Sequence, residues 1–236
     1  MIDKEDRKKI SEIKDLMIDI GSKNKKETEK YLRVGTPACI LSNFMPLLND
    51  FVTSKAWDDK VGAFVVSEVM RILSAKKKQL NVAVYGVSTV QEEIGSRGAK
   101  TSCYGIDPHA GIAIDVGFAT DVPGDDKKVY GNIKLGNGPI LHRGANINIP
   151  LGTMFEKAAA KAEINVQWTA EPSASSTDAD VIQINRSGVA AALVSIPTRY
   201  MHTPVEMCSI SDIEHTVDLI AETILAMPKN PDFLPY

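Results

Sequence analysis

The 236-residue sequence has few cysteines, few aromatic residues and no excess of one charge. Its three cysteines, Cys39, Cys103 and Cys208, lie far apart without a CxxC pair, so we expect reduced thiols in a cytoplasmic protein. The formal net charge is -3 with acids and bases interspersed, which gives no indication of a nucleic-acid or membrane-surface partner. No apolar run approaches the roughly 20 residues that span a bilayer. The hydrophilic stretch Asp3–Lys9 is unlike a signal peptide.

The sequence changes character after its first fifty residues. Residues 1–52 are dense in charges and too short to bury a core of their own, and the alternation in Asp15–Gly21 predicts a half-buried strand. From Trp57 onward, helical apolar stripes alternate with apolar strands, which predicts an α/β sheet covered by helices on both faces. We expect helices near residues 58–77, 151–162 and 211–227, and strands near residues 82–90, 111–118, 165–169 and 189–196.

Two adjacent glutamates follow the most strand-like stretch of the chain. Val82–Val90 is apolar and rich in β-branched residues, which predicts a buried strand of a parallel sheet. Glu92 and Glu93 come directly after it, at the rim where ligands usually bind in open α/β sheets. Neighbouring residues of an extended chain point to opposite sides, so one glutamate can face substrate or water and the other a metal. The alternative is a solvent-exposed loop with two charges.

Further acids and one imidazole stand where other predicted elements begin or end. Asp58 opens a helix, Asp115 lies within an apolar strand, and His202 follows a third strand. Carboxylates together with imidazole are typical of hydrolytic metal sites. A carboxylate within an apolar strand costs several kcal/mol unless it is paired or ligated. A structural salt bridge from Asp115 to Arg97 or Arg199 is therefore an equally open explanation.

Five longer segments make the pattern specific. VQEEIGSRGA, AIDVGFATDVPG, KLGNGP, STDAD and IPTRYMHTPVE occur in this order. With them, the chain from Trp57 to its end resembles the TET-type dinuclear-metal aminopeptidases, metallopeptidase family forty-two, whose members include glutamyl and deblocking aminopeptidases and have often been labelled endoglucanases. The resemblance implies a three-layer α/β sandwich with a mostly parallel central sheet. It assigns residues 53–236 to a catalytic domain lacking its first strands, and residues 1–52 to part of an inserted β-rich, dimerisation-type domain.

The resemblance also implies a role for individual residues. Two divalent metals, zinc or cobalt, would be bridged by Asp58. Glu93 and His202 would complete the set of one metal, and Asp115 would bind the other. Glu92 would be the general base that takes a proton from the attacking water and passes it to the leaving amine of a peptide substrate. Four further residues would contact substrate or support the ligands: Asp59, Asp178, Arg199 and His142. A helix cap or Asx-turn is an equally open explanation for Asp178, and a purely structural role is equally open for Arg199.

One departure from the family limits these expectations. The family carries a further histidine ligand upstream of its inserted domain, and no residue of this chain occupies that position. We therefore expect at most one tightly held metal and weak or no peptidase activity from this chain alone. The alternative is a non-catalytic assembly subunit of the same fold. Because family members commonly form large tetrahedral assemblies, a homo-oligomer is expected.

The glycosidase label fits the residues poorly. Two catalytic carboxyls of a glycosidase flank a bond and stand at least about 5 Å apart. Adjacent Glu92 and Glu93 do not offer that arrangement, and aromatic residues, which form sugar platforms, make up only 6% of the chain.

Overall fold

The computed structural model describes residues 9–124 and 127–234, and the chain divides into two compact units, Met1–Ile40 and Leu41–Tyr236. In the smaller unit, a 3-10 turn at Ile13–Asp15 precedes the short helix α1 (Lys25–Thr28), whose Asn24 side chain accepts a hydrogen bond from the Glu27 amide. None of residues 9–40 is buried. The strand expected at Asp15–Gly21 is wrong, because residues 9–40 offer neither a partner strand nor a buried surface for its apolar side. The assignment of residues 1–52 to an inserted domain stays a prediction.

The larger unit is built on a four-stranded sheet in the order β3-β6-β4-β5. Two of its strand pairs are parallel, β3 with β6 and β4 with β5, while β4 runs antiparallel to β6. The strands expected near residues 111–118, 165–169 and 189–196 are all present, and a smaller antiparallel sheet has the order β1-β2-β7. The strands are β1 (Met45–Pro46), β2 (Phe51–Ser54), β3 (Ala110–Phe118), β4 (Ile140–Gly144), β5 (Gln167–Glu171), β6 (Ala190–Thr198) and β7 (Glu206–Ser209).

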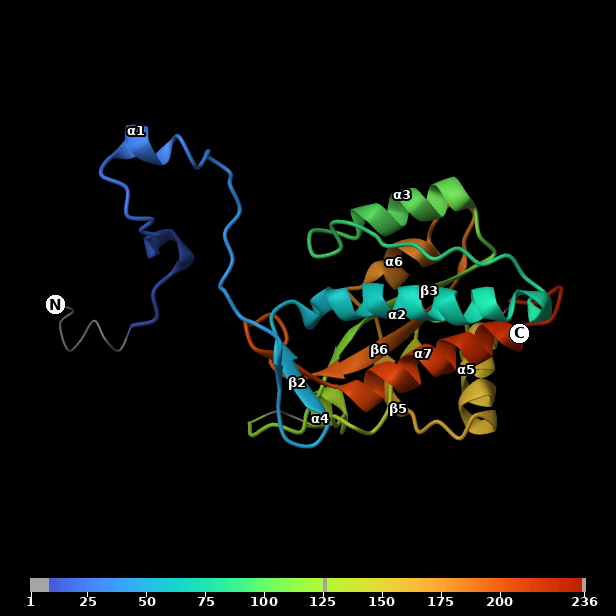
Figure 1. Ribbon diagram of the computed structural model, residues 1–236. Coiled ribbons are helices and arrows are strands. Elements are labelled where there is room, and N and C mark those ends of the chain that lie inside the picture. Colours follow the sequence, from blue (N-terminus) through green and yellow to red (C-terminus); the bar gives the residue numbers. More distant parts are fainter. Residues whose placement is uncertain (1–8, 125–126, 235–236) are drawn as a thin grey trace. The chain divides into compact units, whose positions relative to one another are not determined.

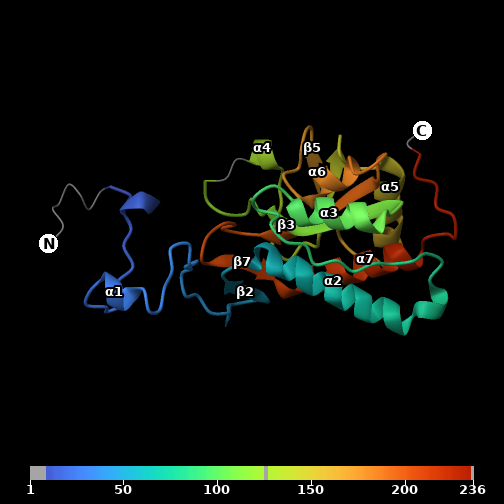
Figure 2. The same cartoon turned by 90° about the horizontal axis from the view of Figure 1, so that it is seen from above.

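Helices cover both faces of the larger sheet, so the expected three-layer arrangement is confirmed. The helices α2 (Trp57–Ala75), α5 (Ile149–Lys161) and α7 (Ile210–Leu225) pack on one face, with α2 and α7 side by side (Figures 1 and 2). On the other face lie α3 (Arg97–Ile106) and α6 (Asp178–Gln183). Two short elements, η3 (Lys77–Gln79) and α4 (Lys127–Tyr130), lie in the connections.

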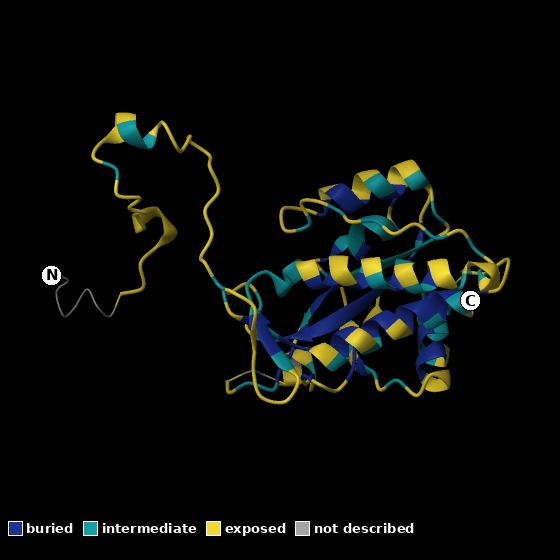
Figure 3. Cartoon of the chain, viewed as in Figure 1, coloured by how far each residue is buried: buried dark blue, intermediate teal, exposed yellow. Residues whose placement is uncertain are grey.

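The main hydrophobic core lies between the sheet and the first helical layer. It is built from apolar side chains of α2, α5, α7 and β6, such as Leu73, Phe155, Leu219 and Ile196. Each of these four is at most 2% exposed, and the buried sheet contrasts with the exposed outer faces of the helices in Figure 3. A second, smaller core group under α6 includes Ala113, Ala179 and Leu193. Within the described residues, no helix is both long and apolar enough to cross a bilayer.

The strand expected at Val82–Val90 is wrong. The segment forms no strand, and its residues are half-buried or exposed. Among the described residues, its only backbone hydrogen bond runs from the Gly98 amide to the Val90 carbonyl (2.9 Å). An apolar run forms a strand only where a neighbouring strand satisfies its backbone, and among the described residues no strand is paired with this segment.

Candidate metal centre and active site

The start of α2 places two acidic side chains at the C-terminal edge of the sheet. Asp58 and Asp59 have non-helical backbone angles (φ/ψ of -76°/109° and -119°/51°), so regular helix begins after them. The Asp59 carboxylate accepts a hydrogen bond from the Gly62 amide at 3.0 Å, as a capping side chain does. Asp58 is thereby left at the helix start with its carboxylate available to residues of other segments.

Three donors from distant segments meet at this point. The ligand atoms of Asp58, Glu93 and His202 all lie within 4.8 Å of one another. The Nε2 atom of His202 is 3.0 Å from Asp58 Oδ2 and 3.7 Å from Glu93 Oε2. The His202 and Glu93 side chains are 62% and 59% exposed, whereas that of Asp58 is only 10% exposed, so the group opens to solvent on one side. Two carboxylates and an imidazole at this separation suit a divalent transition metal.

Glu206, which our sequence interpretation did not single out, holds two of these donors in place. It is 2% exposed at the start of β7, and its two carboxylate oxygens accept hydrogen bonds from the amides of Asp58 (3.1 Å) and His202 (2.9 Å). His202 has a positive φ of 62°, which non-glycine residues seldom adopt, and the Glu206 bond supports that conformation. The only sequence signal for Glu206 is its place as the last residue of the segment IPTRYMHTPVE. The strand that it begins, β7, is not predicted by the sequence pattern.

Substituting Glu206→Gln is expected to loosen this arrangement. The glutamine amide keeps one accepting oxygen and presents an NH₂ group to the second backbone amide, so one bond is lost in a buried site. We expect a loss of about 1–3 kcal/mol in the free energy of unfolding together with weaker metal binding. Urea unfolding and a metal titration would check both, with the exposed Glu214→Gln of α7 as the matched control. An unchanged metal affinity would contradict the positioning role.

One buried acid, Asp115, and two half-buried acids, Asp59 and Asp178, adjoin the group, and burial is the largest cause of each pKa shift. The pKa of Asp115 is raised to about 8 by burial and by the charges of Asp58 and Glu92. That of Asp59 is raised to about 9 by burial and by the charge of Asp115. Burial likewise raises the pKa of Asp178, whose Oδ2 accepts a hydrogen bond from Thr89 and whose buried Oδ1 has no partner among the described residues.

The salt bridge considered for Asp115 is not formed in the described part of the chain. Arg199 pairs with Asp121 instead, at 2.6 Å, and no ion pair joins Asp115 to Arg97. Among the described residues, Asp115 accepts a hydrogen bond only from the adjacent Val116 amide (2.8 Å). A buried carboxylate without a cation is costly, so these acids fit a divalent cation as the missing positive charge. Asp115 does not, however, belong to the three-donor group of Asp58, Glu93 and His202.

Glu92 is placed as a half-buried acid beside this group. Its carboxylate accepts a hydrogen bond from Ser96 Oγ at 3.3 Å. Burial and the charges of Asp178 and Glu93 raise its pKa above the usual range for glutamate. A carboxylate whose pKa is moved toward neutrality is suited to accept a proton and to return it.

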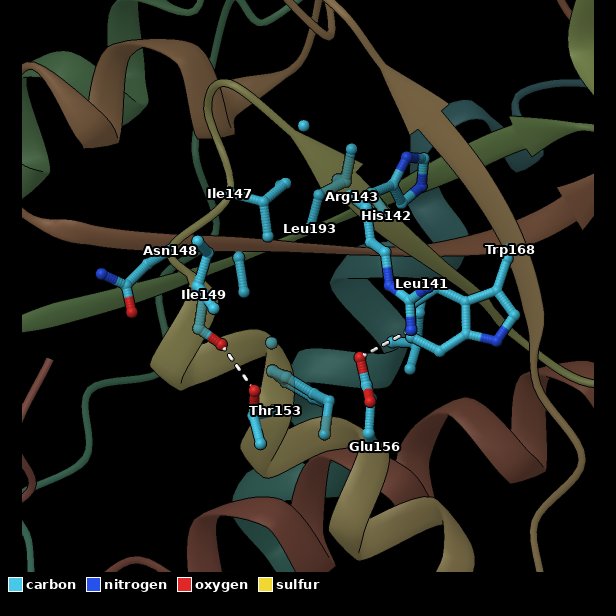
Figure 4. A pocket seen from close by; sticks show the side chains of 14 residues that line it. Leu141, His142, Arg143, Ile147, Asn148, Ile149, Thr153, Glu156, Trp168 and Leu193 are labelled. Carbon is cyan, nitrogen blue, oxygen red and sulfur yellow. Dashed lines mark hydrogen bonds and ion pairs between the residues drawn. The ribbon is translucent and has the colours of Figure 1, made fainter. Parts of the chain in front are cut away.

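His142 lies apart from the donor group, in the middle of the sheet. Its ring nitrogens are 3.1 Å from Glu171 Oε1 and 2.9 Å from Ser195 Oγ, so β4, β5 and β6 are linked through it. It also borders a hollow of about 320 Å³ between β4, β5 and α5 (Figure 4). There Arg143 pairs with Glu156 (2.9 Å) and stacks on the Trp168 ring. None of the site carboxylates lines this hollow.

A second hollow, of about 1400 Å³, does reach the site. Four of the acids line it, Asp59, Glu92, Asp115 and Asp178, and the rest of its wall is mostly apolar. These four carboxylates therefore share one hollow of the larger unit, whereas Asp58, Glu93 and His202 are not among its lining residues.

The known proteins that resemble this chain are peptidases, which agrees with this arrangement. The family model described as M42 glutamyl aminopeptidase matches residues 1–219. A lysyl aminopeptidase of Pyrococcus furiosus is 38% identical over 221 residues, which cover 93% of this chain and 62% of that relative.

Solved structures give the same result. A TET aminopeptidase from the archaeon Thaumarchaeota archaeon SCGC AB-539-E09 is 34% identical with a TM-score of 0.87, covering 96% of this chain and 64% of its own. The TET1 peptidase of Pyrococcus horikoshii, described as able to assemble into a tetrahedron or a large octahedral shell, is 25% identical with a TM-score of 0.71, covering 89% of this chain and 60% of its own. The chain thus spans less than two thirds of the length of these relatives. It belongs to the M42 glutamyl aminopeptidase family.

Proposed function

We propose that this chain is a cytoplasmic metal-dependent aminopeptidase, or the metal-binding part of one, that removes N-terminal residues from peptides. The observation that carries the proposal is the group of Asp58, Glu93 and His202, whose donor atoms lie within 4.8 Å of one another. Membership of a peptidase family supports the reaction class. Buried free thiols at Cys103 and Cys208 suit a reducing compartment.

Each residue of the site has a defined task in this proposal. Asp58, Glu93 and His202 would hold a divalent cation, zinc or cobalt, and Asp115 would face a second one. When bound, such a cation supplies Lewis acidity toward a carbonyl oxygen and a water molecule. Glu92 takes a proton from the attacking water and delivers it to the leaving amine. Burial raises the pKa of Asp59 to about 9 and also raises that of Asp178, and a bound cation would favour their ionised forms. Their negative charge would then favour the ammonium group of a peptide N-terminus.

A second candidate is a non-catalytic subunit that retains the fold for assembly. It is favoured by the exclusion of Asp115 from the three-donor group, which leaves a second metal with an incomplete set. Binding of one metal would then be preserved without turnover, because two-metal hydrolysis depends on both ions.

Hydrolysis of aminoacyl-p-nitroanilides separates the two candidates. The chain is stripped with a chelator, reloaded with zinc or cobalt, and assayed first with lysine and then with glutamate as the N-terminal residue. We expect a slow rate that returns only with the metal and is absent from peptides with a blocked amino group. A reloaded chain no faster than the stripped chain would favour the non-catalytic subunit.

We also propose that the chain forms homo-oligomers through its smaller unit. That unit exposes large apolar side chains, among them Ile10 (96%), Ile13 (88%), Met17 (95%) and Val34 (109%), and exposed apolar groups of this kind mark interaction surfaces. Light scattering during gel filtration should give a mass above that of a monomer. The double variant Ile13→Lys and Met17→Lys should lower it, whereas Lys14→Ala should not. A monomer at all concentrations would contradict the proposal.

A further inference from the structure

The hollow of about 320 Å³ between β4, β5 and α5 has no part in the proposed reaction (Figure 4). It lies toward the β5 end of the sheet, whereas β3, which carries Asp115, is at the other end. Its inner wall is apolar and includes Leu141, Phe155 and Leu193, each at most 3% exposed. A hollow of this volume is at the lower end of the range for ligand pockets, so it suits a small molecule rather than a polypeptide.

A glycine of α5 keeps part of this space open. Gly152 lines the hollow, and outside its own helix a Cβ there would meet only Ile147 Cγ2 among the described residues, at an ordinary 3.8 Å. Gly144, also on the wall, differs because a Cβ there would collide with the Glu171 carbonyl oxygen. Glycine inside a helix is less stable than alanine, and no contact within the described chain requires it at position 152. An occupant of the hollow explains why no side chain fills this space.

Two opposite charges stand together on the solvent side of the hollow. Arg143 of β4 and Glu156 of α5 line it, with side chains 65% and 40% exposed. Arg143 Nη2 donates a hydrogen bond to Glu156 Oε1 at 2.9 Å, and the guanidinium carbon lies 3.9 Å from the centre of the Trp168 ring (Figure 4). Stacking on the indole holds the guanidinium group in place. Its other N–H groups, and Glu156 Oε2, have no hydrogen-bond partner among the described residues and are available to a ligand.

This pair of charges favours a ligand that carries both signs. A simple anion bound to Arg143 would stand beside the Glu156 carboxylate, and a simple cation bound to Glu156 would stand beside the guanidinium group. A free α-amino acid avoids both conflicts, because it carries an ammonium group and a carboxylate on the same carbon. Its carboxylate matches the donors of Arg143 and its ammonium group matches the acceptor oxygen of Glu156.

We propose that this hollow is a binding site for a free aliphatic α-amino acid, whose carboxylate pairs with Arg143 and whose ammonium group pairs with Glu156. The side chain of the amino acid then packs against Leu141, Phe155 and Leu193. Free amino acids are also what an aminopeptidase releases, so the site would sense the product, and this link alone rests on the proposed function. Binding itself does not, because no residue of the three-donor group lines the hollow.

Calorimetric titration of L-leucine into the full chain, stripped of metal with a chelator, tests the proposal. We expect saturable binding of one leucine per chain. N-acetyl-L-leucine lacks the ammonium group and L-leucinamide lacks the carboxylate, so each should bind at least about ten-fold more weakly, the factor that one hydrogen bond between charged groups supplies. No saturable binding of leucine, or equal binding of all three compounds, would overturn the proposal. The stripped chain has no bound metal, so the result is independent of peptidase activity.

Substitutions determine where the leucine binds. Arg143→Ala should weaken binding by at least about ten-fold. Arg71→Ala, which removes a similarly exposed arginine paired with Glu68 on α2, should not. His202→Ala, which disrupts the three-donor group, should also leave leucine affinity unchanged. Full affinity in Arg143→Ala, or loss of binding in His202→Ala, would overturn the proposal.

The glycine of α5 provides a second, independent pair of variants. Gly152→Leu should abolish leucine binding, because the new side chain occupies the hollow, whereas Gly152→Ala adds one methyl group and should reduce binding much less. Thermal unfolding should show that neither variant is less stable than the original chain, since both replace a glycine within a helix. Unchanged leucine binding in a folded Gly152→Leu variant would overturn the proposal.

Discussion

One zinc or cobalt ion per chain is the expected stoichiometry of tight binding, and His202→Ala should weaken that binding by at least about 100-fold. Loss of even an outer partner of a metal ligand costs 10–100-fold in affinity, and His202 would be a direct ligand. The Nε2 atom of His202 lies within 4 Å of a carboxylate oxygen of both Asp58 and Glu93. Neither of these two side chains can take the place of the imidazole as a ligand without moving. Glu93→Gln should have a similar effect, because an amide oxygen is a weaker, uncharged donor.

Elemental analysis and competition with a chromophoric chelator measure this prediction. The matched control is His109→Ala, which removes an exposed imidazole at the opposite end of β3. Two ions held per chain with equal affinity would contradict the expectation of a single complete set. An unchanged affinity in His202→Ala would remove the three-donor group from consideration as a metal site.

The same binding should strengthen with rising pH. The pKa of Asp58 is raised to about 6 by burial and by the charge of Glu93, so at pH 5 this carboxylate is mostly protonated in the metal-free chain. Metal binding must then release the proton of Asp58, whereas above pH 6 this carboxylate is mostly ionised already and no proton need be released. The apparent affinity should therefore rise between pH 5 and pH 7 and flatten afterwards. An affinity that is constant over this range would contradict the placement of Asp58 among the ligands.

The sequence predicts well those strands and helices that have a neighbouring strand or a core surface to pack against in the larger unit. The strands expected near residues 111–118 and 189–196 form and pair with each other as β3 and β6, and the apolar stripe of the helix expected near residues 58–77 packs on the core as its spacing indicates. Val82–Val90 carries an equally strong strand pattern but forms none. Local apolar periodicity reports which side chains would be buried in a sheet, not whether a neighbouring backbone is present to complete it.

The sequence likewise predicts some residues of the candidate site and misses others. Residue type and position relative to predicted elements pointed to Asp58, Glu93 and His202, and the structure brings these three together. Glu206 escaped notice because its role depends on hydrogen bonds to backbone amides of two other segments, which residue spacing does not encode. The family resemblance places His142 and Arg199 near the site. In the structure, His142 contacts Glu171 and Ser195, and Arg199 pairs with Asp121. The catalytic roles of all these residues stay predictions.

Substitution of Glu92→Gln is expected to lower the rate of aminoacyl-p-nitroanilide hydrolysis by about 10²- to 10⁴-fold, the range for loss of a general base. Glutamine has nearly the same shape and can still receive the Ser96 hydrogen bond, but it cannot accept a proton from water. Metal content should stay unchanged, which distinguishes this variant from Glu93→Gln. The matched control is Glu68→Gln on α2, where the carboxylate pairs with Arg71 (2.8 Å).

The pH profile gives an independent test of this role. A base must be deprotonated to act, and the pKa of Glu92 is raised by burial and by Asp178 and Glu93, so the rate should fall on the acid side at a higher pH than for an ordinary glutamate. In Glu92→Gln, the residual rate should lose this acid limb. If the variant retains most of the rate and the same limb, proton transfer belongs to another group. The neighbouring acids Asp59 and Asp178 would then be examined first, because they line the same hollow.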